Sequence, residues 1–184
     1  MEYFILQLDE THTPCWPVGN YGKIDAKTLK GKQFYELPKF LSFSVEETVD
    51  EFPDLIMKPC FMVSGRVKQV ILLYNKSLPF RRILLYSKTQ GKSQSYYIPF
   101  LEEVDCLTEA SQFNMDKSVI RHAVIDGDLL HDKAIVRIKG VNSIYVLIRL
   151  DLAESLLERH FMGFDLKETV TLYNGKPIDI SAFT

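Results

Sequence analysis

The stretch that decides the fold is residues 134–173, AIVRIKGVNSIYVLIRLDLAESLLERHFMGFDLKETVTLY. Two apolar runs rich in β-branched residues, Ala134 to Ile138 and Ile144 to Leu150, lie on either side of a turn segment around Gly140. Such residues favour a pleated, half-buried surface, and glycine favours turns. The pattern therefore predicts a β-hairpin.

A helix and a third strand are predicted after this hairpin. Asp151 is placed to cap a helix, and Glu154 follows three residues later, as in a capping box. Gly163 is placed to end the helix in a left-handed conformation. Phe164 to Tyr173 is predicted to form a further strand. The apolar residues between them recur at helical spacing, with Leu152 and Leu156 on one stripe and Ala153, Leu157 and Phe161 on the next.

The rest of the chain extends this mixture of hairpins and helices. Met1 to Leu8 is a strand candidate, Arg81 to Ser87 and Gln94 to Phe100 form a second predicted hairpin, and Ser64 can cap a helix whose apolar stripe begins at Val67. We predict an α+β fold, with a mainly antiparallel sheet built from hairpins and two or three packed helices. The predicted organisation is a single domain over residues 1–184, in which residues 1–45 could form a subsidiary N-terminal strand-and-loop region.

Composition narrows the class of protein. The chain has 184 residues, 46% hydrophobic content and a net charge of -2, which does not favour a nucleic-acid partner. No stretch approaches the roughly 20 apolar residues of a membrane span, and the first residues lack a basic leader. The chain has three cysteines, Cys15, Cys60 and Cys106. Their odd number and wide spacing are typical of reduced thiols rather than of a disulfide framework. We expect a cytoplasmic protein without a membrane or nucleic-acid partner; the sequence does not set its oligomeric state.

An acidic segment is the predicted partner-binding surface. Ser44 can cap a short helix here, and Val45, Val49 and Phe52 would share its apolar face. The segment either forms a solvated helix face or steers a basic partner by its charge. Its acids, with no lysine or arginine between them, are Glu46, Glu47, Asp50, Glu51 and Asp54.

Aromatic residues in an N-terminal loop leave two interpretations open. Trp16 and Tyr21 lie in a segment rich in proline and glycine, where they either anchor the loop to the core or face a ligand.

One cluster of histidines and carboxylates supports an alternative, catalytic interpretation. Such side chains can ligate zinc or non-haem iron, so the cluster could serve a metal-dependent hydrolase. Asp126-Gly127-Asp128 is equally typical of a turn that follows a strand. The cluster runs to Asp132 and its candidate ligands are His122, Asp126, Asp128 and His131.

Recognisable nucleophile and phosphate-binding motifs are missing from the sequence. The Gly91-Lys92-Ser93 triplet resembles the end of a phosphate loop, but Tyr86 occupies the position of the required first glycine. We therefore expect a non-catalytic protein without a cofactor, although an acid–base pair from distant positions stays open.

Several short segments, spread over roughly residues 50 to 172, carry a family resemblance. They are Phe52-Pro53-Asp54-Leu55, Phe61-Met62-Val63-Ser64, Ser95-Tyr96-Tyr97-Ile98, Asp105-Cys106-Leu107, Val136-Arg137-Ile138-Lys139-Gly140, Asp151-Leu152-Ala153-Glu154-Ser155-Leu156-Leu157-Glu158-Arg159 and Gly163. Their order resembles immunity protein family eleven, a bacterial family first described as a domain of unknown function and later grouped with polymorphic-toxin immunity proteins. The resemblance implies a small cytoplasmic protein that binds and neutralises a cognate toxin domain, and it carries over no site residues. The weak net charge departs from the strongly acidic immunity proteins that inhibit basic nucleases, so the type of toxin stays open.

Overall fold

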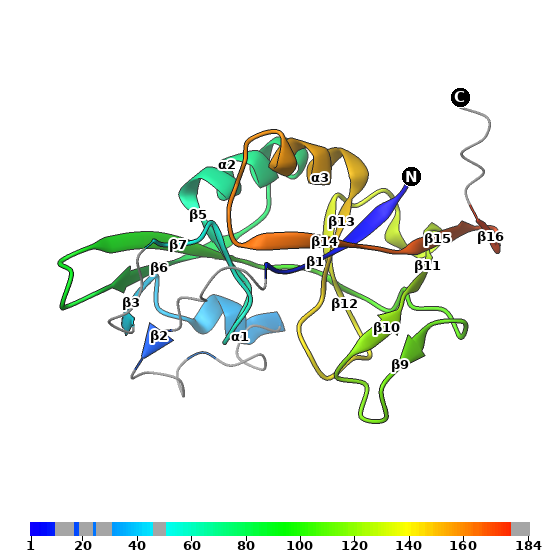
Figure 1. Ribbon diagram of the computed structural model, residues 1–184, viewed down its shortest axis with the longest axis horizontal. Helices are drawn as coiled ribbons and strands as arrows, with labels where there is room; N and C mark the ends of the chain where they lie inside the picture. Colours follow the sequence, from blue (N-terminus) through cyan, green and yellow to red (C-terminus); the bar gives the residue numbers. More distant parts are fainter. Residues whose placement is uncertain (10–16, 19–23, 25–30, 46–50, 178–184) are drawn as a thin grey trace. The chain divides into compact units, whose positions relative to one another are not determined.

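The computed structural model describes residues 1–9, 17–18, 24, 31–45 and 51–177, and these residues form an α+β fold (Figure 1). Three α-helices accompany mixed and antiparallel sheets in this part of the chain, which confirms the predicted class. None of the helices within the described residues is long and apolar enough to cross a membrane.

The chain divides into two compact units, each assembled from separate segments. The first unit comprises Met1–Gln7, Leu101–Ser155 and Leu166–Thr184, and the second comprises Leu8–Phe100 and Leu156–Asp165. That the whole chain unfolds as a single domain stays a prediction.

A five-stranded sheet organises the first unit. β1 pairs antiparallel with β13, β13 pairs antiparallel with β12, and β12 pairs parallel with β8. The predicted hairpin is confirmed as β12 and β13, and its apolar runs supply buried residues such as Val136 and Leu147. In order across the sheet, the strands are β14 (Phe164–Glu168), β1 (Tyr3–Leu8), β13 (Val146–Arg149), β12 (Ile135–Ile138) and β8 (Glu103–Val104).

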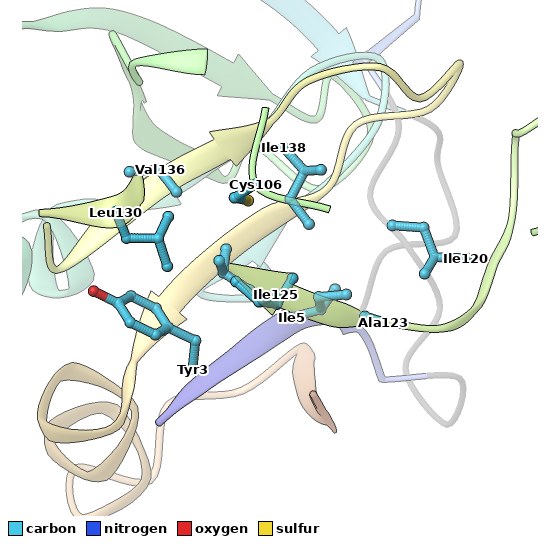
Figure 2. Packing of buried hydrophobic residues seen from close by; sticks show 10 residues of the cluster. Tyr3, Ile5, Cys106, Ile120, Ala123, Ile125, Leu130, Val136 and Ile138 are labelled. Atoms are coloured by element: carbon cyan, nitrogen blue, oxygen red, sulfur yellow. The ribbon is translucent and has the colours of Figure 1, made fainter. Parts of the chain in front are cut away.

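Two smaller sheets complete the first unit. β9 (Gln112–Phe113) pairs antiparallel with β10 (Ile120–His122). The other sheet has the order β11 (Val124–Asp126), β15 (Val170–Tyr173) and β16 (Lys176–Pro177), and the 3-10 helix η2 (Asp128–Leu130) follows β11. Figure 2 shows side chains from several of these strands, among them Ile5, Ile125 and Val136, gathered into one buried cluster around Cys106.

Helix α3 (Leu150–Leu157) follows β13 directly, as predicted, but it is shorter than the pattern indicates. Asp151 lies in its first turn, where its carboxylate accepts the Leu152 N–H at 2.9 Å. The helix ends at Leu157, and the left-handed residue that follows is His160, at φ 51°. The prediction that Gly163 ends the helix is therefore wrong. Gly163, at φ 92°, instead lies where a Cβ would be 2.6 Å from Pro53 Cβ.

A six-stranded sheet organises the second unit. β3 pairs parallel with β6, whereas the other strands pair antiparallel. The predicted second hairpin is confirmed as β6 and β7. In order across the sheet, the strands are β2 (Pro17–Val18), β3 (Phe40–Val45), β6 (Phe80–Tyr86), β7 (Ser93–Pro99), β5 (Met62–Ser64) and β4 (Leu55–Ile56).

Helices α1 (Gly31–Glu36) and α2 (Gly65–Tyr74) lie on opposite sides of this sheet (Figure 1). The predicted cap of α2 is confirmed, because the Ser64 hydroxyl accepts the Val67 N–H at 3.3 Å. The apolar stripe of α2 is buried at Val67, Val70 and Ile71.

Candidate binding surfaces

The predicted acidic surface is described in part. Glu46, Glu47 and Asp50 lie outside the described residues, and Glu51 is exposed. Ser44 and Val45 belong to strand β3, so Val45 does not lie on a helix as predicted.

Asp54 does not belong to an exposed acidic surface, which corrects its place in the predicted patch. Only 2% of the residue is exposed, because its carboxylate is surrounded by donors. The Ser64 hydroxyl donates to Oδ1 at 2.7 Å, the Met162 N–H donates to Oδ2 at 3.1 Å, and Arg66 Nη2 lies 2.8 Å from Oδ2. The Arg66 guanidinium also lies 5.4 Å from the centre of the Phe161 ring. This arrangement, which we call the Asp54 clasp, holds residues 161–162 against β5 and α2 within the second unit.

The histidine–carboxylate cluster does not form a ligand set. Within the described residues, which include this whole cluster, no three His, Cys, Asp or Glu side chains come together to hold a metal ion. His122 is exposed in β10, and His131 is exposed after η2 at φ 46°.

Asp126 and Asp128 instead stabilise a turn, as the second interpretation of this segment predicts. Asp126 Oδ1 accepts the Asp128 N–H at 3.1 Å, and Asp128 Oδ2 accepts the Asn174 N–H at 2.7 Å. Glycine is required at position 127, because a Cβ there would lie 2.5 Å from Tyr173 Cζ.

A shallow pocket of the first unit is lined by Met1, Glu2, Arg149, Leu150, Asp151 and Glu154, two of which form an ion pair. Arg149 Nη2 lies 2.7 Å from Asp151 Oδ2, and this pairing holds the pKa of the Asp151 carboxyl below its ordinary value.

The strongest candidate contact site is residues 114–119, the loop between β9 and β10, which we call the Met115 loop. Asn114 Oδ1 accepts the Val119 N–H at 2.9 Å, and the Asn114 N–H donates to the Val119 carbonyl at 3.0 Å. The Ser118 hydroxyl donates to Asp116 Oδ1 at 2.7 Å, and together with the Ser118 N–H it lowers the pKa of that carboxyl. The backbone of the loop is therefore fixed by its own polar groups.

The turn between β12 and β13 fixes the Met115 loop from outside. The Asn142 N–H donates to the Lys117 carbonyl at 3.0 Å, and the Asn142 side-chain amide donates to the Asp116 carbonyl. The Tyr145 hydroxyl donates to the Ser118 carbonyl at 3.1 Å and accepts the Ile120 N–H at 3.1 Å. Three of these bonds tie the loop to the central hairpin of the first unit, and the fourth ties the start of β10 to it.

The same loop presents apolar side chains to solvent. Met115 is fully exposed, and Val119 is 48% exposed. This site is not among the surfaces predicted from the sequence. The only indication of it in the sequence is a single methionine inside the polar run Asn114 to Ser118. The residues that hold the loop in place lie more than twenty positions later in the chain. A rigid loop with an exposed apolar tip can bind a partner with little loss of conformational entropy.

No family model matches this chain, and no curated protein is significantly similar to it. The contacts of its own residues are therefore the basis for assigning a function.

Proposed function

We propose that this is a non-catalytic cytoplasmic binding protein, and specifically an immunity protein that neutralises a cognate bacterial toxin domain by direct binding. The observation that carries the proposal is the Met115 loop. Methionine is one of the residues enriched in the cores of protein interfaces, and a loop whose backbone is already held in position loses less conformational entropy on binding. The family resemblance over residues 50–172 supports the toxin as the partner.

The loop indicates what the partner surface must provide. Met115 requires an apolar pocket, and the flanking Asp116 and Lys117 are exposed and carry opposite charges. A polar rim around an apolar pocket is the usual anatomy of such an interface. We therefore propose that the toxin domain receives Met115 in a pocket whose rim carries charges of both signs.

The experiment is a binding and co-expression assay with the product of the neighbouring gene. Calorimetry should give a dissociation constant for the wild-type complex, and Met115→Asp should weaken it by about tenfold or more, because a charge replaces the anchor. Leu73→Asp is the matched control, since Leu73 is 66% exposed on α2 in the second unit. This control should leave the dissociation constant unchanged.

Three outcomes would count against the proposal. If the neighbouring protein neither binds nor becomes less toxic on co-expression, the immunity role is wrong. If it binds equally well to Met115→Asp, the loop is not the contact. Stoichiometric metal that is lost on replacing His122 and His131 by Ala would favour the hydrolase.

The acidic segment has its own test within this proposal. Replacing Glu47, Asp50 and Glu51 by Gln should slow association with the toxin and weaken its dependence on salt, because rim charges mainly affect the rate of encounter. Unchanged association kinetics at low ionic strength would remove these acids from the interface.

A further inference from the structure

One face of the six-stranded sheet carries apolar and aromatic groups into solvent. Residues paired directly across strands point to the same face, and the register of β3, β6 and β7 places Phe40, Arg82 and Tyr97 in one row. The next rows across β6 and β7 contain Leu84 with Ser95, and then Tyr86. We call this the β6 face.

Side chains at the β3 side of the β6 face are exposed. Phe40 is 52% exposed and Arg82 is exposed, whereas Ile83 and Leu85, which point to the opposite face, are completely buried. An antiparallel sheet with one solvated face normally alternates apolar and polar residues. Here the outward positions of β6 include Leu84 and Tyr86, so the outward face is itself partly apolar.

Charge is strongly segregated along this part of the sequence. Residues 55–101 carry eight lysine or arginine residues and no aspartate or glutamate, although the net charge of the chain is -2. Strands β3, β6 and β7 likewise contain no acid. A partner on the β6 face would therefore meet positive charge and would be attracted if it were acidic.

Three aromatic rings of the face, those of Phe40, Phe80 and Tyr97, each have a cation over them. Lys68 Nζ lies 4.2 Å from the centre of the Tyr97 ring and 5.4 Å from that of Phe80, and the Arg82 guanidinium lies 5.8 Å from the centre of the Phe40 ring. Single-stranded nucleic acids bind by stacking their bases on free ring faces. Because one face of each of these three rings already holds a cation, less ring surface is left for stacking, whereas the cations themselves suit carboxylates.

We infer that the β6 face binds an acidic protein segment, whose carboxylates pair with Arg82 and Lys68 while its apolar side chains contact Leu84 and Tyr86. The Arg82 guanidinium has five N–H groups. Its Nε and Nη2 donate to the Ser95 hydroxyl at 3.2 Å and 2.9 Å, so its other N–H groups can donate to a carboxylate of the partner. This inference is independent of the Met115 loop and of the identity of the toxin.

The test uses two probes on the full chain at low ionic strength. One is a synthetic peptide that repeats Glu-Glu-Phe, and the other is an oligo-deoxythymidine of similar charge, each about 15 units long. The peptide should bind the wild-type protein, and Arg82→Glu should weaken it by at least about tenfold, as expected for loss of an interface anchor. Arg121→Glu is the control, because Arg121 is an exposed arginine on β10 in the first unit.

Methyl NMR locates the contact, because adjacent residues report opposite faces of the sheet. The Leu84 methyl signals should shift on addition of the peptide, while those of the buried Ile83 should not. Phe40→Ala gives a second variant if Arg82→Glu does not fold. Absence of peptide binding, equal binding by Arg82→Glu and Arg121→Glu, or tighter binding of the oligonucleotide would overturn the inference.

Discussion

At Asp54, one buried carboxylate accepts hydrogen bonds from Ser64, Arg66 and Met162, which come from separate parts of the second unit. Replacing it by Ala leaves the Ser64 hydroxyl and the Met162 N–H without this acceptor. We expect Asp54→Ala to lower the free energy of unfolding by about 1–3 kcal/mol, the cost of leaving buried polar groups unpaired. Arg66 is largely exposed, so its charge adds little to this cost.

Glu51→Ala is the matched control, because this acid of the same segment is exposed. It should change stability by less than about 0.5 kcal/mol. Urea titrations of both variants provide the comparison, and equal losses would show that the clasp adds nothing to stability.

The buried thiol of Cys106 makes the stability of the folded chain depend on pH in the alkaline range. Burial raises the pKa of its thiol from 9.0 to about 12, and burial likewise raises the pKa of the Tyr3 hydroxyl above 10.0. Both groups stay protonated in the folded chain at a pH where the unfolded chain has already lost the proton. The unfolded chain then binds fewer protons, so stability falls as pH rises above about 9, by at most about 1.4 kcal/mol per pH unit for each group.

The slope of stability against pH tests this linkage. Between pH 9 and pH 10, Cys106→Ala should show a smaller loss of stability per pH unit than the wild-type protein. Only the slopes are compared, since the substitution also changes packing. Identical slopes would mean that the thiol ionises equally in the folded and unfolded chains.

Helix α3 offers a test between adjacent residues. Leu156 is 1% exposed, whereas Leu157 is 54% exposed, so the second predicted apolar stripe is correct at Ala153 and wrong at Leu157. Leu156→Ala should cost about 2–5 kcal/mol, because it removes buried methyl groups and leaves a cavity. Leu157→Ala should cost less than about 0.5 kcal/mol in the same denaturant titration. Similar losses for the two variants would contradict the observed face of the helix.

Elements with a local signal could be predicted, and those fixed by distant partners could not. The cap at Ser64, the hairpin of β6 and β7 and the existence of α3 follow from residues that are near one another in the sequence. The Met115 loop is held by Asn142 and Tyr145. The Asp54 clasp includes Met162, which is 108 positions from Asp54 in the sequence. Spacing in a sequence reports only the first kind of contact.

Across the whole molecule, the two compact units are not independent stretches of chain. The chain passes from one unit to the other four times, and α3 begins in the first and ends in the second. Melting either unit would therefore disrupt this helix. We expect one thermal transition, coincident by near- and far-UV circular dichroism, as a two-state domain gives. Two separate transitions would contradict the prediction of a single domain.

Strand β1 lies inside its sheet, between β13 and β14, so both neighbours come from beyond residue 145. On the ribosome, β1 emerges long before either of them. At about 5–20 residues per second, the interval is on the order of ten seconds. Throughout it, the apolar run Phe4-Ile5-Leu6 has no native partner strand and two open edges. The nascent chain is consequently prone to aggregation over this interval, and the first unit closes only after β14 has been synthesised.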